Sequence, residues 1–206
     1  MFVDVRDGAM NWRDLYHLCI SFIVPRPIAL VGTISPGGRH NLAPFSFYNM
    51  VCANPPVVMI SNGLHRDGSL KHTCRNIEAT REFSIATVTA DIGPHMVRSA
   101  AELPYGESEF PFSGLTPAPA RFIRAPLVAE ARINLECSLR QVIVLGEGPG
   151  SSHVMLGDIV AMHIADEVLD ASGACAPHKL TAVGRLGGKW YTNTTSPYEM
   201  SIPPAS

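Results

Sequence analysis

The sequence lacks a long hydrophobic run, a basic cluster and any closely spaced pair of cysteines. No stretch approaches the roughly 20 apolar residues that a membrane-spanning helix needs. The N-terminus carries acidic side chains where a secretory leader would have an apolar core. A formal net charge of −2 argues against a nucleic-acid partner. We therefore expect a cytoplasmic protein that binds neither a membrane nor nucleic acid.

The five cysteines are scattered, and none belongs to a C-x-x-C pair. This spacing argues against a disulfide framework and against a zinc site, so we expect no metal. Cys52, Cys74 and Cys137 stand among apolar neighbours, which is typical of small core residues. A G-x-S-x-G elbow and a G-x-G-x-x-G fingerprint after a strand are also absent, which disfavours a serine hydrolase and a dinucleotide-binding fold.

What is present is a chain of 206 residues, 46% of them hydrophobic, enough to bury a sizeable core in one domain. We expect that domain to span 1–206, with its core at about 20–195. The apolar spacing predicts helices at about 10–22, 69–80 and 91–101, the last one started by Asp91 or Pro94. It predicts strands at about 27–34, 40–47, 56–61 and 82–89 and again within 128–168, with bends at Gly146 and Gly157. Strands dominate, so the sequence predicts a mainly β (α+β) fold, a small antiparallel barrel with a few peripheral helices.

The start of the helix at 69–80 carries charge of the unexpected sign. Asp67 and Ser69 are both possible N-caps. With Ser69 as the cap, residues 71–73 (Lys-His-Thr) fall in the first turn, and Arg66 lies just upstream. A cation there opposes the helix macrodipole. An anion would remove the conflict, because free backbone N–H groups, a lysine ammonium and a threonine hydroxyl together suit a phosphate. The alternative is a solvated cationic surface.

Four segments, in this order, resemble the flavin reductase-like proteins, which form an FMN-binding split β-barrel. They are RPIALVGTISPGGRHNLAPFSFYN with PPVVMIS, SLKHTCRNIEATREFSIATV, SSHVMLGDIVAMHI and VGRLGGKWY. The resemblance covers roughly residues 20 to 200. It implies a flavoprotein with FMN as its cofactor.

The resemblance also implies a set of cofactor-binding residues. Lys71 and Thr73 match the segment that holds the FMN phosphate, although His72 stands where the family often has an acidic residue. The remaining implied contacts are Asn76 in the same helix, Asn41, Ala43, Pro44, Phe45 and Ser46 along the flavin ring, Ser61, Arg26 and Arg185.

The residues alone leave the role of several of these positions open. Strand alternation places Phe45 and Phe47 on one face, where both could be ordinary barrel core. Arg26 could be an arginine at the rim. Arg185 is costly to bury unless it is paired with a flavin phosphate, a carboxylate such as Glu136 or a second subunit.

His153 is a further candidate. With Gly157 and Val160 it approximates the pattern in which related two-component reductases place a histidine against the nicotinamide. The alternative is an exposed strand residue. We name no essential catalytic acid or base.

The irregular segment 102–126 is rich in proline, glycine and aromatic residues. A loop of this length without structure is uncommon unless it has a role. We expect its aromatic side chains to pack on the barrel or on a second subunit, and the alternative is a lid over the flavin.

The resemblance implies hydride transfer from NADH or NADPH to FMN by a homodimer, which supplies a flavin-dependent monooxygenase or another redox partner. Three alternatives stay open at this point. The protein could be an electron carrier of the flavoredoxin type, a non-redox module for another phosphate ligand, or an enzyme that reduces a small organic substrate on bound FMN.

Overall fold

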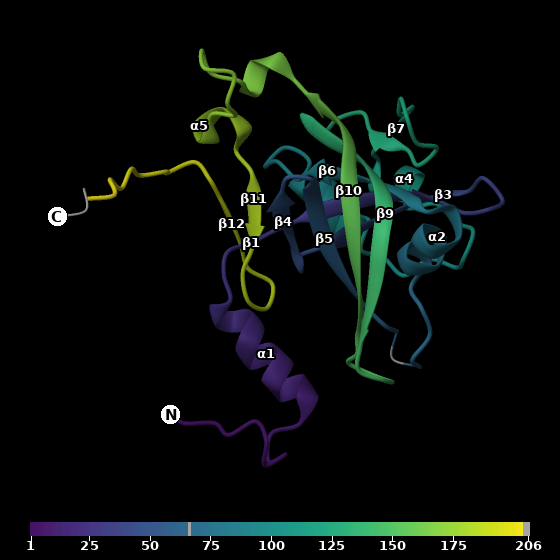
Figure 1. Ribbon diagram of the computed structural model, residues 1–206, viewed down its shortest axis with the longest axis vertical. Helices are drawn as coiled ribbons and strands as arrows, with labels where there is room; N and C mark the ends of the chain where they lie inside the picture. The colour runs from purple at the N-terminus through teal and green to yellow at the C-terminus, as the bar shows by residue number, and fades with distance from the viewer. Residues whose placement is uncertain (66, 204–206) are drawn as a thin grey trace.

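The computed structural model describes residues 1–65 and 67–203, and a curled antiparallel sheet of seven strands forms its centre (Figure 1). Its strands in spatial order are β3 (His40–Phe45), β2 (Ala29–Ile34), β6 (Glu82–Thr87), β9 (Ile133–Leu145), β10 (Ser152–Ile164), β5 (Pro56–Gly63) and β4 (Tyr48–Ala53). The short strands β7 (Pro117–Ala118) and β8 (Leu127–Val128) pair separately. The expected mainly β fold is therefore confirmed.

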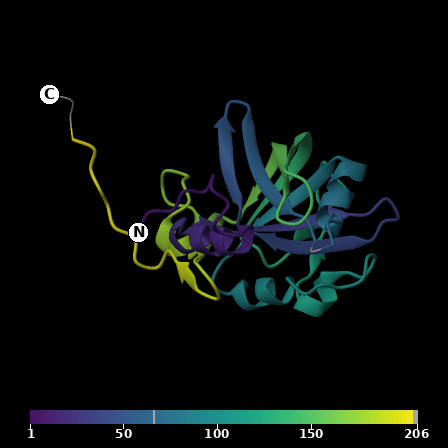
Figure 2. The same cartoon turned by 90° about the horizontal axis from the view of Figure 1, so that it is seen from below.

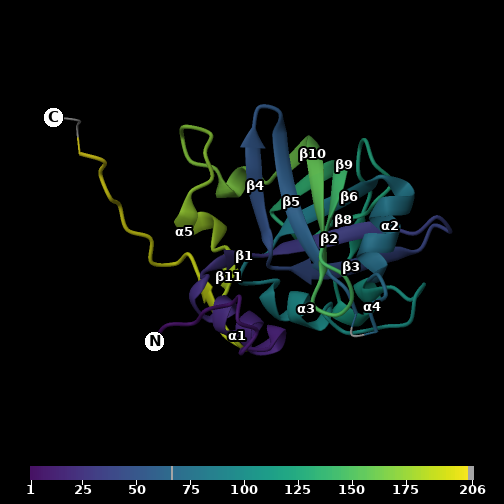
Figure 3. The ribbon, with the colours of Figure 1, turned by 60° about the horizontal axis from the view of Figure 1, so that its bottom comes forward.

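Alternating side chains give the sheet two buried faces. One face carries a core that includes Val31, Ile60, Phe83 and Met155, covered by helix α2 (His72–Thr80). The opposite face of β2, β3 and β6 packs on α3 (Gly93–Arg98) and α4 (Glu109–Ser113). Figure 3 shows α2 on one side of β3, with α3 and α4 below it.

A smaller sheet of β1 (Arg26–Pro27), β11 (Val183–Arg185) and β12 (Tyr191–Asn193) stands beside the large one. Helix α1 (Trp12–Phe22) leads into it, capped by the Asn11 side chain. The 3-10 turn η1 (Asp166–Val168) and α5 (Pro177–Leu180) connect β10 to β11. The C-terminal tail extends away from the rest (Figure 2). None of the helices within 1–65 and 67–203 has the length and hydropathy of a membrane span.

The expected strand at 40–47 ends early, because the chain turns at residues 46–47 and begins β4 on the far side of the sheet. Phe47, interpreted as barrel core, is therefore 40% exposed. Cys52, also expected in the core, lies on edge strand β4 and is exposed. Cys74 and Cys137 are buried as expected, and burial raises the pKa of each thiol to about 12.

Two helices are shorter than the apolar spacing predicted. Helix α2 starts at His72, with Lys71 at the N-cap position, whereas the Asp67 carboxylate accepts from Ser69 within the preceding turn. Helix α3 has Pro94 in its first turn but Ile92 as its cap. The expected cap Asp91 instead pairs with Arg132. Arg66 lies outside the described residues.

The expected bend at Gly157 is a bulge where β10 shifts register against β9. A Cβ atom at this glycine would lie 2.3 Å from Cζ of Phe83, so only glycine fits there. Gly146, the other expected bend, adopts φ +76° at the end of β9, where the β9–β10 hairpin turns.

Candidate functional site

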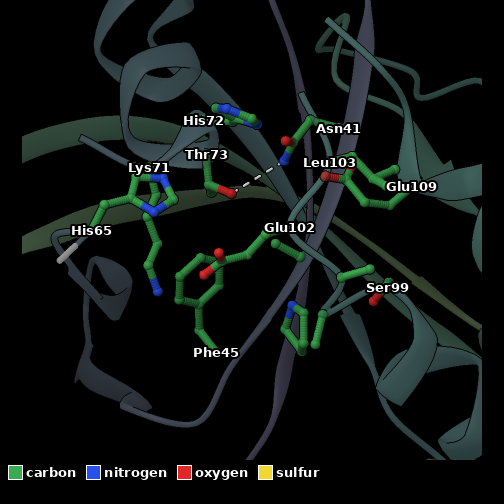
Figure 4. Close-up of a pocket in the computed structure, with 14 residues that line it drawn as sticks. Asn41, Phe45, His65, Lys71, His72, Thr73, Ser99, Glu102, Leu103 and Glu109 are labelled. Atoms are coloured by element: carbon green, nitrogen blue, oxygen red, sulfur yellow. Dashed lines mark hydrogen bonds between the residues drawn. The ribbon is translucent and has the colours of Figure 1, made fainter. Parts of the chain in front are cut away.

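The N-terminal end of α2 is an uncapped, cationic helix start. No side chain caps it, and its first turn contains no acidic residue. Thr73 Oγ1 accepts from the Asn41 side chain at 3.1 Å, which leaves the hydroxyl proton of Thr73 free to donate. Within the described residues, Lys71 forms no ion pair, and Figure 4 shows its ammonium directed into a hollow. Lys71 and Thr73, the side-chain donors of the predicted anion site, thus line one cavity.

This small hollow has a volume of about 190 Å³. It is lined by Asn41, Ala43, Pro44, Phe45, His65, Lys71, His72, Thr73, Glu109 and residues 99–103. Strand β3 and helix α2 therefore bring together six of the predicted cofactor contacts and the neighbouring His72. Burial, then the nearby His65 and Arg75, lower the pKa of His72 and so disfavour its protonated form.

Nothing in the sequence pointed to the two acids in the small hollow. The Glu109 carboxylate is 4% exposed and accepts the Leu42 N–H at 2.8 Å. Burial raises the pKa of Glu109. Glu102, from the start of the irregular segment 102–126, also lines the hollow (Figure 4). An anion is consequently favoured beside α2 and disfavoured beside Glu109.

A large hollow of about 710 Å³ adjoins the small one and shares Pro44, Phe45 and Lys71 with it. Its other walls come from α1, β5 and the β9–β10 turn, and include the predicted Ser46 and Ser61. Trp12 of α1 packs on that turn, where a Cβ on Gly150 would lie 3.0 Å from the indole. The two joined hollows suit an elongated ligand with a flat apolar part and an anionic end.

Arg26 is a buried clamp and not an arginine at the rim. It is 7% exposed, and its guanidinium donates to the carbonyls of Ile20, Ile23 and Leu186. Burial lowers the pKa of Arg26. Its longest contact, 3.4 Å, reaches Ser46 Oγ. Arg26 therefore holds α1 and the small sheet beside the large hollow, and most of its donors are occupied.

Arg185 lies across from Arg26 in the small sheet and stacks on Tyr191 with 4.4 Å from Cζ to the ring centroid. It is only partly buried and forms no ion pair within the described residues. Glu136, one of three partners considered for Arg185, lies elsewhere, fully buried against His163. Pairing of Arg185 with Glu136 is therefore wrong, whereas a flavin phosphate or a second subunit stays a prediction.

Asn76 does not line either hollow but supports the site through buried hydrogen bonds. It is 1% exposed, donates to Thr33 Oγ1 and accepts from the Tyr105 hydroxyl. Tyr105 also lies under Arg75 of α2. The segment 102–126 therefore combines packing on its own subunit with a wall of the small hollow.

His153 lies on β10 and lines neither of the two hollows. Its side chain is 16% exposed, and Nδ1 lies 3.1 Å from Oε1 of Glu78 on α2. This orientation gives the nicotinamide contact no support, and that contact stays a prediction.

A curled antiparallel sheet with a cationic helix start beside two adjoining hollows is the arrangement of a split-barrel protein. The chain belongs to the family of proteins with a flavin reductase like domain, whose model matches residues 21–182. Nitrilotriacetate monooxygenase component B from Bacillus cereus is 30% identical, with a TM-score of 0.90, and the match covers 97% of this chain and 99% of that one.

Two further solved structures are similar to this chain. The 2-nitrobenzoate 2-nitroreductase of Pseudomonas fluorescens is 28% identical, with a TM-score of 0.87 and complete coverage of both chains. A flavin reductase with a split barrel domain from Shewanella frigidimarina is 24% identical, with a TM-score of 0.82. The match covers 100% of this chain and 99% of that one. The last likeness confirms the split-barrel fold.

Proposed function

We propose that the protein binds FMN and transfers a hydride to it from NADH or NADPH. The observation that carries this proposal is the uncapped start of α2, with Lys71 and Thr73 facing a hollow that opens into a larger, mostly apolar one. A phosphate suits the first and a flat ring system the second. Membership of the flavin reductase family supports the same conclusion.

In this arrangement Lys71, the Thr73 hydroxyl and the first N–H groups of α2 hold the phosphate. Ala43 leaves room for close approach along β3, and Ser46 and Ser61 offer hydroxyl groups at the wall of the large hollow. FMN would supply the hydride chemistry, and the protein supplies orientation and electrostatics. We assign no proton-transfer residue.

The likeness to nitrilotriacetate monooxygenase component B supports delivery of reduced flavin to a separate monooxygenase. An anaerobic titration tests the core of the proposal. Purified protein is mixed with FMN or FAD and then with NADH or NADPH, and flavin absorbance is followed. We expect FMN binding and bleaching by at least one nicotinamide. A protein that binds neither flavin, or binds FMN that stays oxidised with both nicotinamides, would contradict it.

A second candidate function is the direct reduction of a nitroaromatic compound on bound FMN, favoured by the likeness to 2-nitrobenzoate 2-nitroreductase. Anaerobic turnover assays distinguish direct nitroaromatic reduction from flavin reduction. Consumption of NADH or NADPH that depends on added 2-nitrobenzoate, with FMN remaining bound, would support this candidate. Turnover that depends on added free FMN would support the reductase.

We also propose a homodimer. Edge strand β4 is exposed along most of its length, with Met50 and Val51 about half exposed. Phe47 beside it and Met162 on β10 add apolar surface. An exposed apolar edge strand favours association with another chain. Size-exclusion chromatography with light scattering should give twice the mass of one chain, and a monomer at micromolar concentration would refute the dimer.

A further inference from the structure

Three chemically distinct side chains, from α2 and β10, meet between these two elements. Cys74 and Glu78 are four residues apart and therefore share one face of the helix. Cys74 Sγ lies 3.5 Å from Glu78 Oε1, and His153 Nδ1 lies 3.1 Å from the same oxygen. One sulfur, one oxygen and one nitrogen all lie within 4.8 Å of one another.

The neighbouring strand adds an unpartnered amide. Asn62 on β5 lies directly opposite His153 in the antiparallel pairing, so both side chains point to the same face of the sheet. Asn62 is fully buried, and within the described residues neither its Oδ1 nor its Nδ2 has a hydrogen-bond partner. A buried amide without hydrogen-bond partners is unfavourable, so a polar group or water is expected beside Asn62.

We propose that Cys74, Glu78 and His153 bind a divalent metal ion of the zinc class, with Asn62 hydrogen-bonded to a water in the fourth position. Sulfur, imidazole and carboxylate ligands suit zinc, whereas calcium and magnesium take mostly oxygen ligands. On binding, the ion replaces the proton of the Cys74 thiol, which is released to solvent. The proposal departs from the expectation of no metal drawn from cysteine spacing, because its ligands come from two distant segments.

Two of the three ligand pairs already have nearly tetrahedral spacing, and the Cys74 and His153 ligand atoms lie within 4.8 Å of each other. Ligand bonds of about 2.0–2.3 Å place two ligand atoms of a tetrahedral site roughly 3.3–3.6 Å apart. The His153–Glu78 and Cys74–Glu78 distances are already close to that range. β10 is paired on both sides, by β5 and β9, which fixes the backbone of His153. The Glu78 side chain is 36% exposed and gives an ion a route from solvent.

Cobalt(II) is the probe, because a cobalt–thiolate bond produces a charge-transfer band in the near ultraviolet. The full-length protein is dialysed against a chelator and titrated with Co²⁺, and then with Zn²⁺ or Mg²⁺. We expect one Co²⁺ per chain, the thiolate band, and displacement by Zn²⁺ but not by Mg²⁺. Absence of the band, or displacement by Mg²⁺, would overturn the proposal. The readout requires neither flavin nor nicotinamide, so it is independent of the proposed function.

Variants identify the ligands. Cys74→Ala should abolish the thiolate band and weaken binding by at least about 100-fold, since losing even an indirect contact costs 10- to 100-fold. Glu78→Gln, at a partly exposed position, should fold normally and weaken Co²⁺ binding about 10-fold or more. Cys52→Ser removes an exposed thiol elsewhere and should change nothing. Unchanged Co²⁺ affinity in a folded Glu78→Gln variant would overturn the assignment, even if Cys74→Ala fails to fold.

Discussion

Replacing Lys71 with alanine separates recognition of the FMN phosphate from recognition of the flavin ring. Lys71 occupies the N-cap position of α2 without a side-chain cap bond, and it forms no ion pair within the described residues. Its loss therefore leaves no partner unpaired, and the melting temperature should hardly change. A hydrogen bond to a charged group contributes about 1.5–3 kcal/mol. Because about 1.4 kcal/mol corresponds to a tenfold change in the dissociation constant, FMN affinity should fall roughly 10- to 100-fold.

The assay compares FMN with riboflavin, which has the same ring and no phosphate, by fluorescence titration of the apoprotein. Lys71→Ala should weaken the binding of FMN and leave the binding of riboflavin unchanged, because riboflavin has no phosphate charge for the ammonium to contact. Lys179→Ala serves as the matched control, since Lys179 is exposed on α5 and donates to the Leu169 carbonyl, away from both hollows. Equal losses for both ligands, or an unchanged FMN affinity, would refute the phosphate site at α2.

The remaining predictions concern stability. Gly157→Ala would press a Cβ against Phe83 and should destabilise the protein by about 1–3 kcal/mol in urea unfolding, whereas Gly93→Ala, with 3.9 Å to its nearest neighbour, should not. If both variants unfold alike, the close approach at the bulge is not a constraint. Because burial raises the pKa of Glu109, the folded state keeps that proton to higher pH than the unfolded state, and stability falls as pH rises from the ordinary value of 4.5 through the folded pKa. Glu109→Gln can still accept the Leu42 N–H, and its melting temperature between pH 4 and 8 should lose this part of the pH dependence. An unchanged pH profile would show that Glu109 ionises as readily in the folded state as in the unfolded state.

Local signals in the sequence were sufficient for most of the elements and for the cationic start of α2. Apolar alternation indicated most strands, and the cationic start of α2 pointed to Lys71 and Thr73, which are close in sequence and share one helical turn. These inferences hold because hydrogen-bonding partners and side-chain direction within a single element depend on near neighbours. Element ends were less certain: the turn before β4 was missed, because a strand exposed at the sheet edge lacks the apolar alternation of a buried one.

Contacts between distant segments were decided only by the tertiary structure. Arg26 could not be identified as a buried clamp, because its acceptors are carbonyl groups, which every residue carries. Glu109 enters the small hollow from an irregular segment without periodicity. His153 meets Glu78 across 75 residues of sequence. The sequence by itself thus determined most of the strands and which helix start carries cationic and hydroxyl side chains. The curl of the sheet determined which buried polar groups share one site, because only pairing register and helix docking bring them within bonding distance.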